Sequence, residues 1–165
     1  MKSKLILSAL FAIISFPLKA QLDTIPLTIG CKTFLDSKIT GEKFEIWIRI
    51  PDNSEKVKNS MSLLILLDGD EYFKMASDVV ELFEWSEKMP PTVIVGQPST
   101  TESRWKYYTP TNQPYKEKSN PEDSLLYSIS GKFELFANFI NAEFIPEVSA
   151  LLKTNFISKT IFGHS

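Results

Sequence analysis

Two short apolar runs constrain this 165-residue chain more than any other feature. Each is long enough for one strand and too short for a helix; they are Ser62–Leu67, which is followed by Asp68 and Gly69, and Pro91–Gly96. Strands that are apolar on both faces are typical of parallel sheets covered by helices on both sides. Between the runs, apolar side chains recur at helical spacing at Tyr72, Met75, Ala76, Val79, Val80 and Phe83. A strand, a helix and another strand predict a parallel βαβ unit.

The flanking segments extend this pattern. Ile25–Leu35 and Phe44–Ile50 are predicted strands, and the second alternates apolar and polar residues, as a strand with one buried face does. A second helix is predicted from near Ser130, with Pro146 kinking or ending it, because proline lacks the N–H of the helical ladder. Its predicted apolar face comprises Phe133, Phe136, Ala137, Ile140 and Phe144. Lys159–Phe162 enters a last strand, so the order predicts an α/β fold with a mostly parallel sheet and flanking helices.

The N-terminus has the pattern of a secretory signal peptide. Lys2 and Lys4 precede a short apolar run that ends before Ala20, and such a run is too short to span a membrane. We therefore expect residues 1–20 to be removed, a secreted or periplasmic protein, and no membrane span in the mature chain. A buried N-terminal helix is the alternative. Residues 21–165 then form part of a single domain.

Composition excludes several classes of protein. The formal net charge is −2, and the chain has one cysteine and one histidine. These numbers argue against nucleic-acid binding, a disulfide framework and a zinc finger. Cys31 is expected to be a small buried side chain on a strand, with lipid acylation as the weaker alternative. No cofactor or metal is expected: the acidic group Asp68, Asp70 and Glu71 suits a turn and a helix N-terminus.

A long polar segment, residues 97–128, follows the second buried strand and contains four prolines. In α/β sheets, ligands bind beyond the carboxyl ends of the strands. The aromatic residues of the segment are Trp105, Tyr107, Tyr108, Tyr115 and Tyr127. The first four suit either a substrate cleft or a surface loop held against the body of the protein, and the sequence leaves both open.

The chain ends in Ile161-Phe162-Gly163-His164-Ser165. Gly-x-Ser directly after a strand is the first half of a nucleophile elbow, in which a tight turn exposes the serine hydroxyl. The triplet is common by chance, but its place after a predicted strand of an α/β pattern favours this interpretation.

Four segments together resemble the esterase D / enterochelin-esterase group of α/β hydrolases. They are Leu63–Gly69, Val93–Gly96 followed by Arg104 and Tyr108-Thr109-Pro110, the helix Gly131–Pro146, and Gly163-His164-Ser165. The resemblance covers roughly residues 30–165. Tyr107 stands where that group usually has aspartate.

The resemblance implies a secreted serine esterase that hydrolyses carboxylic esters of the siderophore, acyl-sugar or feruloyl type. It makes Ser165 the nucleophile and the backbone N–H of Asp70 an oxyanion donor. Arg104, Trp105 and Tyr108 are expected to contact a small-molecule or glycan ester.

The group carries its triad acid and histidine after the serine, so we expect this chain to be the N-terminal part of the domain, truncated after the strand that leads into the elbow and inactive alone. His164, the neighbour of Ser165, is not expected to serve as its base. The alternative is a catalytically inactive exported domain that binds a carbohydrate or siderophore through residues 97–128.

Overall fold

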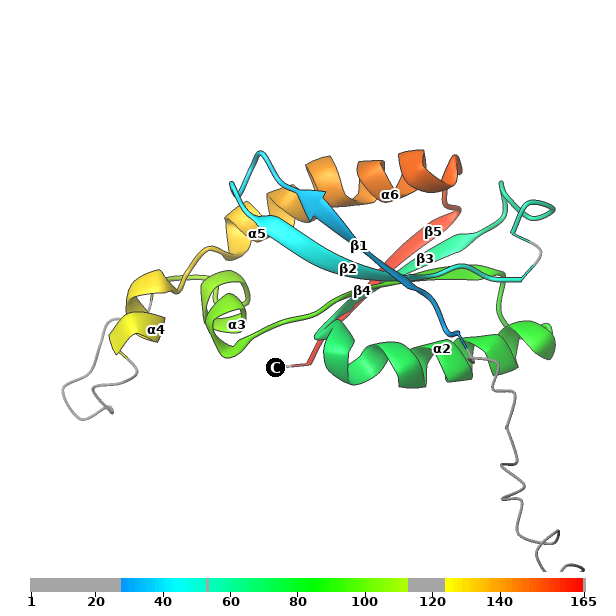
Figure 1. The fold of residues 1–165 in the computed structure, drawn as a ribbon, viewed down its shortest axis with the longest axis horizontal. Coiled ribbons are helices and arrows are strands. Elements are labelled where there is room, and N and C mark those ends of the chain that lie inside the picture. Colours follow the sequence, from blue (N-terminus) through cyan, green and yellow to red (C-terminus); the bar gives the residue numbers. More distant parts are fainter. Residues whose placement is uncertain (1–27, 53, 113–123, 165) are drawn as a thin grey trace, which may run out of the picture.

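The computed structural model describes residues 28–52, 54–112 and 124–164. Five strands form one sheet in the order β1-β2-β4-β3-β5 (Figure 1). They are β1 Cys31–Asp36, β2 Lys43–Arg49, β3 Ser62–Leu67, β4 Thr92–Gln97 and β5 Ser158–Phe162. Strand β2 runs antiparallel to both of its neighbours, β1 and β4, while β4, β3 and β5 are parallel to one another. The predicted mostly parallel sheet is confirmed; the predicted signal peptide, residues 1–20, lies outside the described residues.

Helices cover both faces of the sheet (Figure 1). Helix α2, Gly69–Trp85, lies on one face. The other face carries a continuous helical segment of α5 Phe133–Phe139, the π-helix η2 Ile140–Phe144 and α6 Ile145–Leu152. Two apolar clusters fill the two layers: Leu63 and Ile65 of β3 belong to the larger one, and Leu66 belongs to the one beneath α2. This is why β3 is apolar on both faces.

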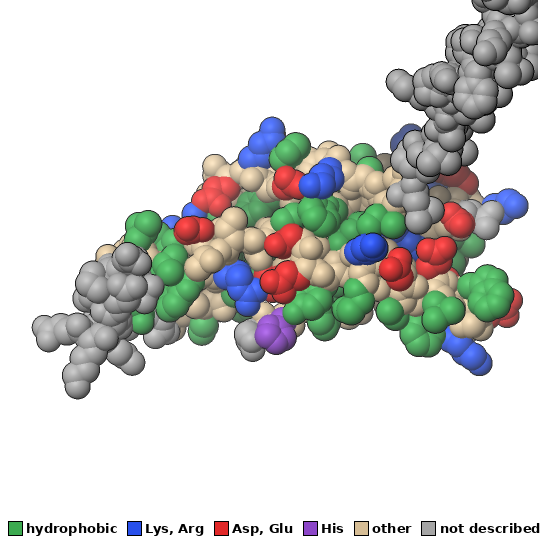
Figure 2. Space-filling view, turned by 60° about the horizontal axis from the view of Figure 1, so that its bottom comes forward, with side chains coloured by type: hydrophobic (Ala, Val, Ile, Leu, Met, Phe, Trp, Pro, Cys, Tyr) green, Lys and Arg blue, Asp and Glu red, His purple; other side chains and the backbone are tan. Residues whose placement is uncertain are grey.

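The buried face of α2 matches the predicted one only in part: Val80 is buried, and Tyr72 and Ala76 pack against the core. Met75, Val79 and Phe83 are about half exposed, and Figure 2 shows apolar side chains gathered along the outer side of this helix. The residues that face the sheet are Gly69, Phe73, Ser77 and Val80. A Cβ at Gly69 would lie 2.7 Å from the backbone of Gly96, so the close approach of two glycines sets the rotation of the helix. Ser77 is accommodated because its hydroxyl donates to the Phe73 carbonyl at 2.7 Å.

The second helix begins at Phe133 rather than near Ser130, and Phe133 itself is exposed. Phe136, Ile140 and Phe144 are buried as predicted. Pro146 does not end the helix, because a π-helical turn immediately before it accommodates the missing N–H and α6 continues to Leu152. By length and composition alone, 133–152 is also the one helix among the described residues that could cross a membrane. Here it packs on the sheet and contributes to its core.

Two further expectations were wrong. The segment 97–128 is not a continuous loop: it contains α3, Thr101–Tyr107, and α4, Ser124–Ile129. Thr100 begins α3, because its hydroxyl accepts the Ser103 N–H while the Ser103 hydroxyl accepts the Thr100 N–H. Cys31 is exposed rather than buried, because it starts the edge strand β1. Tyr115 lies outside the described residues.

Candidate active site

The parallel strands β3, β4 and β5 end at the same edge of the sheet. Asp68 follows β3, Ser99 lies two residues beyond β4, and His164 lies two residues beyond β5. Hydrogen bonds and an ion pair between these turns bring them together. This edge is the position at which α/β sheets bind ligands.

Asp68 is the buried centre of this edge. Its backbone has the left-handed conformation (φ 58°, ψ 46°), which aspartate tolerates better than most residues. Its side chain is 2% exposed, and the carboxylate accepts from the Ser99 hydroxyl and forms an ion pair with Arg104. A buried carboxylate is stable only when it is paired in this way, so Asp68 ties β3 to the segment after β4.

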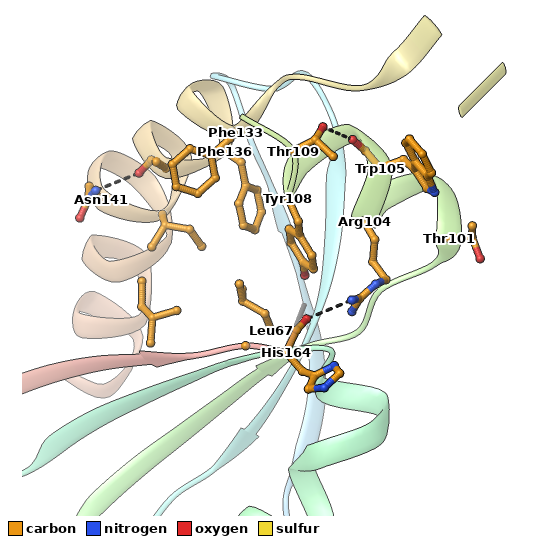
Figure 3. Close-up of a pocket in the computed structure, with 14 residues that line it drawn as sticks. Leu67, Thr101, Arg104, Trp105, Tyr108, Thr109, Phe133, Phe136, Asn141 and His164 are labelled. Carbon is orange, nitrogen blue, oxygen red and sulfur yellow. Dashed lines mark hydrogen bonds between the residues drawn. The ribbon is translucent and has the colours of Figure 1, made fainter. Parts of the chain in front are cut away.

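Arg104 on α3 joins Asp68 to the turn after β5, and Figure 3 shows its bond to the His164 carbonyl. Nη1 contacts Asp68 Oδ2, and Nη2 donates to the His164 carbonyl at 3.0 Å. Hydrogen bonding to Asp68 raises the pKa of the Arg104 guanidinium further above its ordinary value, so it is always charged. Arg104 therefore connects the turn after β3 with the turn after β5.

Tyr108 stands beside this pair. Its hydroxyl donates to Gln97 Oε1 at 3.1 Å, and the Arg104 guanidinium lies 5.5 Å from its ring centre. Burial, together with the negative charge of Asp68, raises the pKa of the Tyr108 phenol above its ordinary value. Tyr108 is therefore a neutral donor and an apolar wall at physiological pH.

Trp105 lies further out on α3. Its ring packs edge-on against Tyr127 of α4, with ring centres 5.1 Å apart. It is half-buried, and Figure 3 shows its side chain turned away from Arg104. The contact joins α3 to α4 and places an aromatic surface near the site.

A cavity of about 660 Å³ opens beside Gly163 and His164 (Figure 3). Its walls are mostly apolar and include Leu67, Phe136 and Ile140. Arg104, Trp105 and Tyr108 line the side nearest α3. The three residues expected to contact substrate therefore share one wall of one cavity.

Asp70 lies in the first turn of α2. The N–H groups of Glu71 and Tyr72 donate to the Asp68 carbonyl at 3.0 and 3.2 Å, but the Asp70 N–H has no acceptor among the described residues. Free N–H groups at a helix N-terminus favour negative charge. The Asp70 carboxylate accepts the Ser99 N–H at 3.1 Å, which holds this turn in place.

The first turn of α2 lies next to the end of β5. Tyr72 meets Phe162 edge-on at 5.3 Å between ring centres, and a Cβ on Gly163 would lie 3.2 Å from the Leu67 side chain. Figure 2 shows the chain's one histidine at the surface, beside acidic and basic side chains. Ser165 follows directly in the sequence and lies outside the described residues.

Comparison with protein families decides the relationship. Residues 37–165 match the Esterase family, described as "Putative esterase". The chain belongs to this esterase family. No curated protein shows a significant match to it.

Solved structures agree with the esterase fold. The chain is similar to an IroE-like serine hydrolase from Shewanella oneidensis, with 26% identity and a TM-score of 0.70 over 82% of this chain and 42% of that one. The BES protein from Bacillus cereus is 23% identical, with a TM-score of 0.67 over 87% of this chain and 56% of that one. The siderophore hydrolase EstA from Aspergillus nidulans is 19% identical, with a TM-score of 0.65 over 88% of this chain and 54% of that one. The chain thus spans about half the length of these proteins.

Within the esterase fold, the acidic group has divided roles. Asp70 and Glu71 occupy the first turn of α2, as expected for acids at a helix N-terminus, whereas Asp68 is buried against Arg104. No cluster of three potential ligands for a metal occurs in the described part of the chain. Sequence reasoning missed the pairing of Asp68 with Arg104 and Ser99; its only trace in the sequence is an aspartate directly after a strand that is buried on both faces.

Proposed function

We propose that this protein is a serine esterase that hydrolyses carboxylic esters with Ser165 as the nucleophile. The observation that carries the proposal is the contact of Phe162, at the end of β5, with Tyr72 in the first turn of α2, where the Asp70 N–H has no acceptor among the described residues. A donor at a helix N-terminus beside the end of β5, the strand that precedes Gly163, His164 and Ser165 in the sequence, suits an oxyanion that develops during ester hydrolysis. Membership of the esterase family supports the same chemistry.

The proposed reaction has two steps. The Ser165 oxygen attacks the ester carbonyl, the Asp70 N–H donates to the resulting oxyanion, and the alcohol leaves with the serine proton while an acyl-serine forms. Water then attacks the acyl-serine and releases the acid. We assign no general base among the described residues, since the His164 carbonyl is held by Arg104 and its ring belongs to the residue next to the nucleophile.

For the substrate, we propose an ester with an apolar or aromatic acyl group, and within this class a siderophore ester. The apolar walls of the cavity, with Trp105 and Tyr108 on one side, support the first part. The similarity to a protein named as a siderophore hydrolase supports the second. Acyl-sugar and feruloyl esters are the competing substrates in a direct assay.

The test is hydrolysis of short p-nitrophenyl esters by the full-length protein expressed from its gene. Ser165→Ala is expected to lower kcat by about 10⁴- to 10⁶-fold, because loss of the nucleophile removes the action of the whole catalytic group. Ser60→Ala is the matched control: this exposed hydroxyl donates only to the nearby Val57 carbonyl. Near-normal turnover by Ser165→Ala would overturn the proposal, and an unaltered protein that binds a siderophore or glycan without turnover would favour the binding domain.

We also propose that residues 1–20 are a secretory signal peptide and that the mature protein is secreted or periplasmic. The support is the sequence alone: two lysines, a short apolar run and Ala20. N-terminal sequencing of the exported protein is expected to begin at or near Gln21. A protein found only in the cytoplasm with an intact Met1 would contradict this.

A further inference from the structure

We propose that Asp68 and Arg104 are a positioning pair. They hold the first turn of α2, which carries the Asp70 N–H, and the nucleophile turn, Gly163–His164, in fixed positions relative to each other. Arg104 therefore acts on the rate of ester hydrolysis rather than on substrate affinity. The inference rests on the proposed function, because it assigns Asp70 and Ser165 their roles. It changes the role expected for Arg104, which the family resemblance places among the substrate contacts.

Asp68 controls where α2 begins. Its carbonyl accepts the N–H groups of Glu71 and Tyr72, so a shift of Asp68 also shifts the first turn of the helix and with it the Asp70 N–H. Its carboxylate is 2% exposed and is held from two sides, by the Ser99 hydroxyl and by Arg104. Removal of either contact frees a residue whose left-handed backbone depends on its surroundings.

Arg104 controls where the nucleophile turn lies. Nη2 donates to the His164 carbonyl at 3.0 Å, and His164 directly precedes Ser165. Because the guanidinium is planar and rigid, its contact with Asp68 through Nη1 fixes the direction of this second bond. The two turns that must converge on one carbonyl group of the substrate are thus joined through the Arg104 side chain.

The anchoring of α3 supports a positioning role. The helix is held at its start by the Thr100–Ser103 capping box and at its end by the Tyr107 hydroxyl, which donates to Glu42 at 2.7 Å. The Arg104 side chain is 35% exposed, so it reaches the cavity wall, but two of its donors point at protein groups. A mutation that lets such a group move by about 1 Å can cost about 10²-fold in rate.

The experiment separates rate from affinity. The full-length protein and its Arg104→Lys and Arg104→Gln variants are assayed with p-nitrophenyl acetate and with the anionic mono-p-nitrophenyl succinate. The expected result is a fall in kcat of about 10²-fold for Arg104→Gln with both esters, a smaller fall for Arg104→Lys, and KM within about threefold of the unaltered value. A rise in KM confined to the anionic ester, with kcat retained, would assign Arg104 to substrate binding and overturn the inference.

Arg49→Lys is the matched control. Arg49 is also an arginine in an ion pair, with Glu84, but it is buried and lies at the opposite end of the sheet. We expect this variant to lose thermal stability and to keep the kcat of the folded protein. If Arg49→Lys lowers kcat as strongly as Arg104→Gln, general loosening of the fold explains both effects and the inference fails.

A second measurement does not depend on turnover. Asp68→Asn, Arg104→Gln and the double variant form a cycle of thermal-unfolding experiments, in which we expect the double variant to lose less stability than the sum of the two single losses. Additive losses would contradict the pair. If the unaltered protein hydrolyses no ester, the proposed function fails and the effect on rate fails with it; if it is active and the Arg104 variants keep its kcat, only the positioning role fails.

Discussion

The two ends of the sheet each contain an arginine paired with a carboxylate, and the pairs differ in what they hold. At one end, Arg49 Nη2 lies 2.8 Å from Glu84 Oε2, with the side chains 9% and 15% exposed. Arg49 also donates to the Thr92 carbonyl at 3.2 Å, and Glu84 accepts the Thr92 N–H. At the other end, the Asp68 side chain is only 2% exposed, but Arg104 is 35% exposed and its second contact is the His164 carbonyl.

The difference shows how place in the fold decides the role of the same chemical pair. Arg49 and Glu84 connect β2, β4 and α2, all of which are regular elements, and no residue of the candidate site depends on them directly. Arg104 and Asp68 connect turns that follow strands, where backbone groups lack regular partners and are available for chemistry. We therefore expect damage at the first end to appear as lost stability and damage at the second end as lost rate.

The largest effect on stability is expected from breaking the Arg49–Glu84 pair on one side. Arg49→Met leaves the Glu84 carboxylate without its cation in a largely buried position, and the loss is expected to be about 3 kcal/mol or more of unfolding free energy. Denaturant unfolding measures it. Lys32→Met, which removes the cation of the exposed Lys32–Glu45 pair, is the control and is expected to cost less than about 1 kcal/mol.

The double variant Arg49→Met/Glu84→Gln sharpens this test. The amide oxygen that replaces the Glu84 carboxylate can still accept the Thr92 N–H, while no uncompensated charge remains, so much of the lost stability should return. If the double variant is as unstable as Arg49→Met alone, packing rather than an unpaired charge is the cause, and the comparison of two ion pairs loses its basis.

A comparable effect, now on rate, is expected from Asp70→Pro at the end of the sheet that carries the candidate site. Proline is tolerated in the first turn of a helix but removes the N–H, and loss of one oxyanion donor costs about 10²- to 10³-fold in kcat. Asp70→Ala is the matched control, since it keeps the N–H and loses only the bond from the Ser99 N–H. Equal kcat values for the proline and alanine variants would remove Asp70 from the proposed mechanism.

The sequence predicted the centre of the sheet well. Its signals are local: β3 has the predicted bounds, and β4 differs by one residue at each end, because a strand buried on both faces must be apolar at every position. The face of α2 was only partly right: Val80 is buried, and Tyr72 and Ala76 pack against the core, but Met75, Val79 and Phe83 do not face the sheet. The buried face also includes Gly69 and Ser77, which an apolar pattern does not detect. The helices α3 and α4 were missed, because seven and six residues are too short to show a helical period, and α3 is mostly polar.

The candidate site was only partly predictable. Arg104, Trp105, Tyr108 and Asp70 were identified through the family resemblance, and the structure places them along one edge of the sheet. The pairing of Asp68 with Arg104 joins residues far apart in the chain, and no periodicity encodes such a contact. Tyr107 stands in place of the usual aspartate of the family and is buried, donating to Glu42. The role of Ser165 stays a prediction from the sequence.

Glu42 provides a second, weaker contact that holds α3 at the end of the sheet that carries the candidate site. It lies in the turn between β1 and β2 and contacts α3 through an ion pair with Lys106 and through the Tyr107 hydroxyl at 2.7 Å. Burial opposes ionisation here, but the hydrogen bonds from Lys106 and Tyr107 outweigh it and lower the pKa of the Glu42 carboxyl below its ordinary value of 4.5. Unlike the Arg49–Glu84 pair, this anchor is partly exposed to water, with the Glu42 side chain 42% exposed.

The smallest effect is therefore expected from Glu42→Gln, and it should depend on pH. At pH 7 the variant is expected to lose less than about 1 kcal/mol of unfolding free energy, as partly exposed ion pairs do. A carboxyl whose pKa is lower in the folded state than in the unfolded state stabilises the fold fully above the unfolded pKa, and this stabilisation disappears as the pH falls through the folded pKa. The difference in Tm between the unaltered protein and Glu42→Gln should thus be constant from pH 7 to about pH 5 and shrink toward zero below pH 4.5.

Glu55→Gln, at an exposed pair with Lys58, is the control for a single lost carboxylate. A difference in Tm that stays the same down to pH 3 would mean that Glu42 holds α3 through packing and neutral hydrogen bonds rather than through its charge. The two ends of the sheet would then differ less in their electrostatics than the geometry of their ion pairs indicates.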